Sequence, residues 1–164
     1  MVWCIRCPSP STAVGTSLAQ TVTTSNVQIP LTSVTVDGSG SEYTVSTASN
    51  DIVFDGADGS KVFEVSLYAR FDLSGQGTGG STRSYAVTTP RLESTVLTNY
   101  EVWTYIREFQ GATNGVANNS GAITFQVQPA VDDTLDFVVR GVTDTGTLTD
   151  FEIDGIVITV KRVA

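Results

Sequence analysis

Hydrophobic and polar residues alternate along two long segments of the chain. The segment KVFEVSLYARFDL (residues 61–73) has an apolar residue at every second position, namely Phe63, Val65, Leu67, Ala69 and Phe71. The segment NYEVWTYIREF (99–109) sets Tyr100, Val102, Thr104 and Ile106 on one face, and Trp103, Tyr105, Arg107 and Phe109 on the other. A period of two is typical of a strand in an antiparallel sheet with one buried face. We therefore predict two long, half-buried strands.

Shorter apolar runs extend this pattern to the C-terminal part of the chain. They are AITFQVQ (122–128), TLDFVVR (134–140) and GIVITV (155–160), and shorter candidate strands lie at 42–46, 51–55 and 84–88. Clusters of Gly, Asn and Asp separate the runs, and these residues favour turns. Strands at this spacing without amphipathic helices between them predict an all-β sandwich or barrel.

The run Ile156–Val160 is too apolar for an exposed strand, although it lies close to the end of the sequence. Most domains leave a polar tail after their final element. We therefore expect this strand to lie at the centre of the fold.

The first 36 residues differ from the rest of the chain. They carry one charged side chain, Arg6, and half of the positions from Pro8 to Ser25 are Ser or Thr. Such a neutral segment suits an extended arm that pairs with another surface, or an unattached leader. We expect an arm at 1–36 and a β-sandwich domain at 37–164. The residues expected to carry contacts of the arm are Trp3, Cys4, Cys7, Val22, Val27 and Ile29.

The order of these segments resembles the TNF/C1q-like jelly rolls, above all those of bacteriophage virion proteins. The resemblance rests on YTVSTASNDIVF (43–54), NYEVWTYIRE (99–108), AITFQVQPAVDDTLDFVVRG (122–141) and FEIDGIVITVKRV (151–163). One departure is Asp132, which stands where that family usually has a glycine. The resemblance implies an antiparallel jelly-roll β-sandwich that forms homotrimers, with the last strand near the threefold axis. The subunit interface or core would then include Trp103, Tyr105, Phe109, Ile156, Ile158 and Val160.

Charge excludes some classes of partner. The net charge is -8 and no cluster of Lys or Arg is present, so a nucleic-acid surface is not expected. No apolar stretch is long enough for a membrane span, and no secretory signal is evident. We expect assembly in a cytoplasm.

Catalytic chemistry is not expected either. The chain has no His, which excludes Ser-His-Asp and Cys-His arrangements. Acid pairs at Asp132/Asp133, Asp144/Asp150 and Glu152/Asp154 are explained by turns and sheet edges. We predict that the protein is not an enzyme and needs no cofactor.

Two motifs raise the question of metal binding. Cys4 and Cys7 have CxxC spacing, but the chain lacks the further Cys or His ligands of a structural zinc site. Free thiols or a local disulfide are the simpler interpretation, with zinc shared between copies as the alternative. Asp55 and Asp58 in DGADGS could hold calcium, although a hairpin turn explains them more simply. We predict no metal site.

The leading functional hypothesis is a structural virion protein, a trimeric cement or decoration protein on the capsid surface that binds the major capsid protein. An extended arm of residues 1–36 would span roughly 100 Å and staple neighbouring capsomers. The alternative is the trimeric head of a tail or head fibre that binds a host surface glycan through loops 75–80 and 111–121. A C1q-like binding module is a third possibility.

Overall fold

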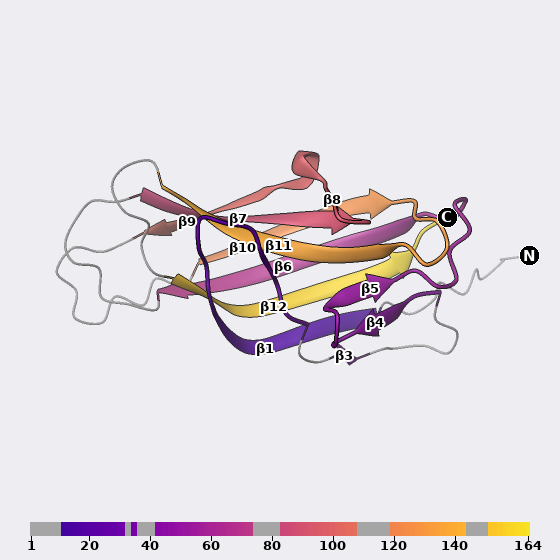
Figure 1. Cartoon of the computed structure of the whole chain (residues 1–164), viewed down its shortest axis with the longest axis horizontal. Coiled ribbons are helices and arrows are strands. Elements are labelled where there is room, and N and C mark those ends of the chain that lie inside the picture. The colour runs from indigo at the N-terminus through magenta and orange to yellow at the C-terminus, as the bar shows by residue number, and fades with distance from the viewer. Residues whose placement is uncertain (1–10, 32–33, 36–41, 74–82, 108–118, 144–150) are drawn as a thin grey trace, which may run out of the picture.

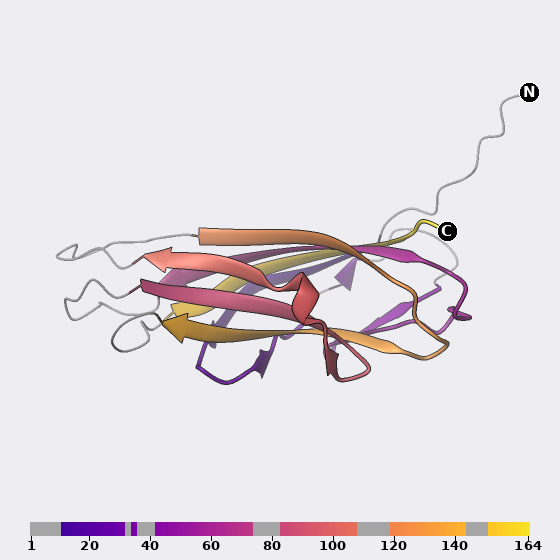
Figure 2. The ribbon, with the colours of Figure 1, turned by 90° about the horizontal axis from the view of Figure 1, so that it is seen from above.

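Two antiparallel sheets packed face to face make up the fold (Figures 1 and 2). This computed structural model describes residues 11–31, 34–35, 42–73, 83–107, 119–143 and 151–164. Within these residues, no helix has the length and hydropathy needed to cross a membrane.

The first sheet, called sheet A, has five strands. Their order across the sheet is β10 (Asn119–Val127), β6 (Phe63–Leu73), β12 (Phe151–Arg162), β1 (Ser11–Thr21) and β3 (Val34–Thr35). The longest strands are adjacent, which gives the sheet a continuous hydrogen-bonded centre.

The second sheet, called sheet B, has seven strands. Its main path is β4 (Thr44–Ser46), β5 (Asp51–Val53), β11 (Thr134–Thr143), β7 (Arg83–Leu92) and β8 (Thr95–Val96). Two further strands join it: β9 (Val102–Arg107) pairs with β7, and β2 (Val27–Gln28) pairs with β11. A 3-10 turn at Thr98–Tyr100 precedes β9.

From β5 onward the chain crosses repeatedly between the sheets. Strands β6, β10 and β12 belong to sheet A, whereas β5, β7, β9 and β11 belong to sheet B. This alternation of antiparallel strands between two packed sheets is the jelly-roll arrangement. The predicted fold class, an antiparallel jelly-roll β-sandwich, is confirmed.

The core lies between the sheets and follows the predicted two-residue period. All five inward residues of β6, from Phe63 to Phe71, are at most 2 % exposed. Sheet B contributes Leu135, Phe137 and Val139 from β11. At one end of the core, the hydroxyl of Tyr43 donates a hydrogen bond of 2.8 Å to the carbonyl oxygen of Val160.

Strand β12 lies between β6 and β1, so it is hydrogen-bonded along both edges. Its side chains Ile156, Ile158 and Val160 point into the core and are buried. The central position predicted for this strand is confirmed. Burial on the core side accounts for the apolar side chains at these three positions.

The expected division between an arm and a domain at residue 37 is wrong for the described residues. Strand β1 pairs with β12 from Ser11, opposite Val160, to Thr21, opposite Glu152. Two residues assigned to the arm, Val22 and Ile29, are core residues at 2 % and 0 % exposure. The neutral Ser/Thr segment is indeed a strand laid on another strand, but its partner is β12 of the same chain.

Of the remaining arm residues, Val27 lies in β2 and is half-buried. Trp3, Cys4 and Cys7 lie outside the described residues.

The sandwich has two different ends (Figure 1). At one end β1 begins opposite Val160, and the backbone N–H of Val62 donates to the carbonyl oxygen of Ala164. At the other end Leu73 pairs with Phe151, and Arg83 pairs with Arg107. Segments 74–82, 108–118 and 144–150 are therefore all attached at the second end.

Candidate functional site

An aromatic surface lies on the outer side of sheet B, away from the core. The register of β7 and β9 places Tyr85 opposite Tyr105 and Val87 opposite Trp103. Trp103 and Tyr105 are 52 % and 40 % exposed, whereas Thr104 and Ile106, between and beside them in β9, are buried. We call the outer-side residues Tyr85, Glu101, Trp103, Tyr105 and Arg140 the aromatic face.

Among the three rings of the aromatic face, that of Tyr85 is in contact with both of the others. The ring centroids of Tyr85 and Trp103 are 5.8 Å apart with an interplanar angle of 66°, and those of Tyr85 and Tyr105 are 5.4 Å apart. Edge-on and tilted ring pairs at this separation are favourable. Because the rings come from two paired strands, the rigid sheet fixes their spacing.

An ion pair holds the indole of Trp103 from the side. Its Nε1 donates to Glu101 Oε2 at 3.1 Å, and Arg140 Nη2 lies 3.3 Å from Glu101 Oε1. The Arg140 guanidinium carbon is also 5.8 Å from the centroid of the Trp103 ring, within range of a cation–π contact. A partly exposed pair of this kind adds little stability, about 0–1 kcal/mol. Its main effect is to fix the orientation of the indole.

The residues predicted to lie in the subunit interface or the core fall in two different places. Trp103 and Tyr105 are exposed on sheet B, whereas Ile156, Ile158 and Val160 are core residues of sheet A. These three side chains cannot contact a neighbouring subunit while the sandwich is intact. Phe109 lies outside the described residues.

The outer side of sheet A presents a different surface. Tyr68 of β6 is 43 % exposed there, and the register places it between Ala122 of β10 and Val157 of β12. In the next row, the hydroxyls of Ser66 and Thr124 are hydrogen-bonded at 2.9 Å. This surface, which we call the tyrosine face, includes the outer side of β12. It also carries the exposed Arg70 beyond Tyr68 and the ion pair of Lys161 with Glu64 beyond Ser66.

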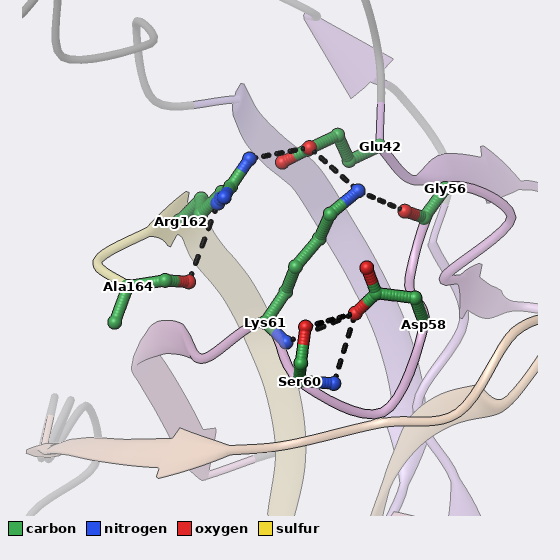
Figure 3. Close-up of polar contacts among 7 residues, drawn as sticks. All are labelled: Glu42, Gly56, Asp58, Ser60, Lys61, Arg162 and Ala164. Carbon is green, nitrogen blue, oxygen red and sulfur yellow. Dashed lines mark hydrogen bonds and ion pairs between the residues drawn. The ribbon is translucent and has the colours of Figure 1, made fainter.

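The DGADGS turn does not gather carboxylates for a cation (Figure 3). Oδ1 of Asp58 accepts hydrogen bonds from the backbone N–H and the hydroxyl of Ser60, at 2.9 Å and 2.6 Å, and from the N–H of Lys61. These hydrogen bonds, above all that from the Ser60 hydroxyl, lower the pKa of Asp58. Asp55 instead accepts from the Thr44 hydroxyl. Across the described parts of the chain, no three Asp, Glu, Cys or His side chains are grouped to hold a metal.

Two positively charged side chains, Lys61 and Arg162, lie beside this turn. Lys61 Nζ is 2.5 Å from the carbonyl oxygen of Gly56 and 2.9 Å from Glu42 Oε1 (Figure 3). Arg162 Nη1 reaches the same Glu42 oxygen at 2.8 Å. Glu42 thus joins the end of β12 to the connection before β6.

One of the acid pairs noted in the sequence, Asp132 and Asp133, lies in the turn before β11. Asp133 Oδ2 accepts a hydrogen bond of 2.7 Å from the backbone N–H of Ala130, which closes the turn before β11. Asp132, in the same turn, has φ of 64°, a conformation in which glycine is favoured and Asp is tolerated. Asp144 and Asp150 lie outside the described residues.

Sequence reasoning identified Trp103 and Tyr105 but missed Tyr85, Glu101 and Arg140. Glu101 could have been found, because it precedes Trp103 by one strand period. Arg140 and Tyr85 come from strands whose register with β9 is a tertiary property.

Comparison with known proteins gives little further information. No family model matches the chain, and no curated protein matches it. Among solved structures, the Eiger TNF from S. frugiperda is similar at a TM-score of 0.49 and 11 % sequence identity, over 97 % of this chain and 94 % of that chain. The jelly-roll assignment therefore rests on the strand order observed here.

Proposed function

We propose that the chain is a non-catalytic structural protein of a virion, a homotrimeric decoration protein on the outer surface of a capsid. Its partner would be the major capsid protein. The observation that supports this role is the difference between the two ends of the sandwich. One end holds the start of β1 and the end of β12, and the other holds the attachment points of three connecting segments.

In this proposal, the end that holds Ser11 and Ala164 faces the capsid. Residues 1–10 precede β1 at that end, and ten extended residues reach roughly 33 Å. This is shorter than the arm of 36 residues expected from the sequence, because residues 11–35 contribute strands to the sandwich. A staple between neighbouring capsomers would therefore involve residues 1–10 alone.

The trimer in this proposal forms through the tyrosine face. This surface includes the outer side of β12, the strand that the family resemblance places near a threefold axis. At its centre the exposed ring of Tyr68 lies between the apolar side chains of Ala122 and Val157, which a second copy could cover. The aromatic face, on the opposite side of the sandwich, is then left open.

A pair of matched substitutions tests the choice of trimer surface. Tyr68 and Tyr105 are 43 % and 40 % exposed on opposite sheets. Tyr68→Lys should reduce the mass measured by light scattering from trimer to monomer, while Tyr105→Lys should leave the trimer intact. The reverse result would make the aromatic face the interface, and a monomeric wild-type protein would exclude the trimer.

The virion role is tested by counting copies of the protein in purified particles by quantitative mass spectrometry. A ratio near one per capsid subunit is expected for a decoration protein. Deleting residues 1–10 should then abolish attachment to capsids without changing the trimer. Complete absence from particles would overturn the proposal.

A fibre head that binds a host surface glycan is the second candidate. It is favoured by the position of segments 74–82 and 108–118, which are attached at the same end of the sandwich. The first contains the predicted tip loop 75–80, and the second contains most of the predicted tip loop 111–121, whose last three residues belong to β10. A few copies per particle, rather than about one per capsid subunit, would support this candidate.

A further inference from the structure

We infer that the aromatic face is a binding site for a neutral carbohydrate, which stacks a sugar ring on Trp103. The inference goes beyond the proposed virion role, because it applies equally to a decoration protein and to a fibre head. It also differs from the loop-based glycan site considered above, since the residues involved lie on the rigid strands β7, β9 and β11.

The indole of Trp103 is a large apolar ring held half-exposed in a fixed orientation. Trp103 is 52 % exposed although it contacts Tyr85, Glu101 and Arg140. A large ring that is already ordered loses little conformational entropy when a ligand binds. The apolar C–H face of a sugar ring is a suitable partner for an indole, because both surfaces are flat.

The polar groups beside the indole suit the hydroxyl groups of a sugar. Each sugar hydroxyl both donates and accepts a hydrogen bond. Glu101 supplies carboxylate acceptors and Arg140 supplies several N–H donors, side by side. Their side chains are 19 % and 31 % exposed, so a ligand on Trp103 can reach both.

The charges at and around the site favour a neutral ligand. Glu101 and Arg140 neutralise one another, and the chain as a whole carries a net charge of -8. An anionic polysaccharide would be repelled by the molecule and would meet no unpaired cation at this ion pair. The expected ligand is therefore a neutral glycan.

A second protein subunit is a poorer occupant than a sugar. A dry protein interface over Trp103 would bury the Glu101–Arg140 pair, and desolvating two charges is costly. A carbohydrate leaves such a pair partly in contact with water and can bridge it through hydroxyls or ordered water.

Fluorescence offers a direct test, because the chain has two Trp residues, Trp3 and Trp103. In the Trp3→Phe variant of the full chain, all Trp emission comes from Trp103. We expect a saturable change in this emission with at least one of cellohexaose, mannohexaose, galactan and dextran, and none with an anionic hyaluronan hexasaccharide. No change with any neutral glycan at millimolar concentration, or a response to hyaluronan alone, would overturn the inference.

Substitutions then locate the site by calorimetric titration with the responding glycan. Trp103→Ala should weaken binding by about tenfold or more, as expected for loss of a central aromatic contact. Arg140→Lys should weaken it less, since the charge stays but the planar donor fork is lost. Val131→Ala, at an exposed apolar side chain in the turn before β11, should leave the affinity unchanged. Equal losses for Val131→Ala and Trp103→Ala would place binding elsewhere.

Protection of Trp103 from acrylamide quenching in the ligand-free oligomer would also contradict the inference. In that case another subunit covers the aromatic face, and the trimer substitutions described above would identify it independently.

Discussion

Individual residues at turns carry backbone strain in this fold. The hairpin between β7 and β8 has a two-residue loop, Glu93 and Ser94, with φ of 49° and 64°. Positive φ at both positions is typical of a type I′ turn, which strongly favours Asn-Gly. At Glu93 side-chain hydrogen bonds offset the cost of positive φ, because Oε1 accepts from the backbone N–H and the hydroxyl of Thr134. Ser94 has no comparable contact among those observed.

We therefore predict that Ser94→Gly stabilises the protein by about 0.5–1 kcal/mol, because glycine adopts the left-handed conformation without strain. The greater conformational freedom of glycine in the unfolded chain offsets part of this gain. The midpoint of urea unfolding measures the change. Ser25→Gly, in an exposed bend without positive φ, is the control and should not stabilise. Equal destabilisation by both substitutions would contradict the prediction.

At the scale of elements, β9 and β10 close one side of the sandwich although they belong to different sheets. A side chain of Asn119 in β10 donates to the carbonyl oxygen of Tyr105 in β9. A Cβ atom at Gly121 would lie 2.3 Å from Thr104 Oγ1 and 2.6 Å from Val102 Cγ1. The two edges approach this closely because glycine occupies position 121.

Gly121→Ala should accordingly cost about 1–3 kcal/mol by overpacking, since the opposing Thr and Val side chains are short and stiff. The double variant Gly121→Ala/Thr104→Ala should recover part of this loss, because Thr104 Oγ1 is buried without a hydrogen-bond partner in the structure. Thermal unfolding followed by circular dichroism measures both. Ser120→Ala, exposed on the same strand, should change stability little, and full tolerance of Gly121→Ala would refute the close approach.

Which elements could be predicted depended on where their partners lie in the sequence. The alternation in β6, β10 and β11 identified their buried faces correctly, because the order of apolar and polar residues within each strand shows which side is buried. Strand β7 was predicted as 84–88 but runs from Arg83 to Leu92, since its Thr-Thr-Pro-Arg stretch interrupts the apolar pattern. Gly121 was assigned to a loop because it follows a cluster of Gly and Asn residues, which favour turns, but it lies in β10.

Strand β1 was taken for an arm because its sequence is neutral and weakly periodic. Its place in the sheet is set by β12, about 140 positions later in the chain. The candidate site was predictable to the same extent: alternation placed Trp103 and Tyr105 away from the core, but no local pattern could bring Arg140 beside Trp103.

At the scale of the whole molecule, the first and last long strands complete one sheet. Removing β1 would leave one edge of β12 unpaired over nearly its whole length and would expose that side of the core. We predict that deletion of residues 1–10 leaves a folded protein, whereas deletion of 1–21 gives an aggregating one.

Size-exclusion chromatography and far-ultraviolet circular dichroism distinguish these outcomes. A 1–21 deletion that stays soluble with an unchanged unfolding midpoint would mean that β1 is dispensable, and the original division into arm and domain would be restored.

The central position of β12 also constrains when the protein can fold during its synthesis. Strand β6 is made early, but it has β10 on one side only until residues 151–162 leave the ribosome. Domains generally fold as units, and pairing between strands distant in sequence is slow. The nascent chain therefore carries unpaired apolar strands until residues 151–162 have been made, and such strands are potential binding sites for chaperones during synthesis.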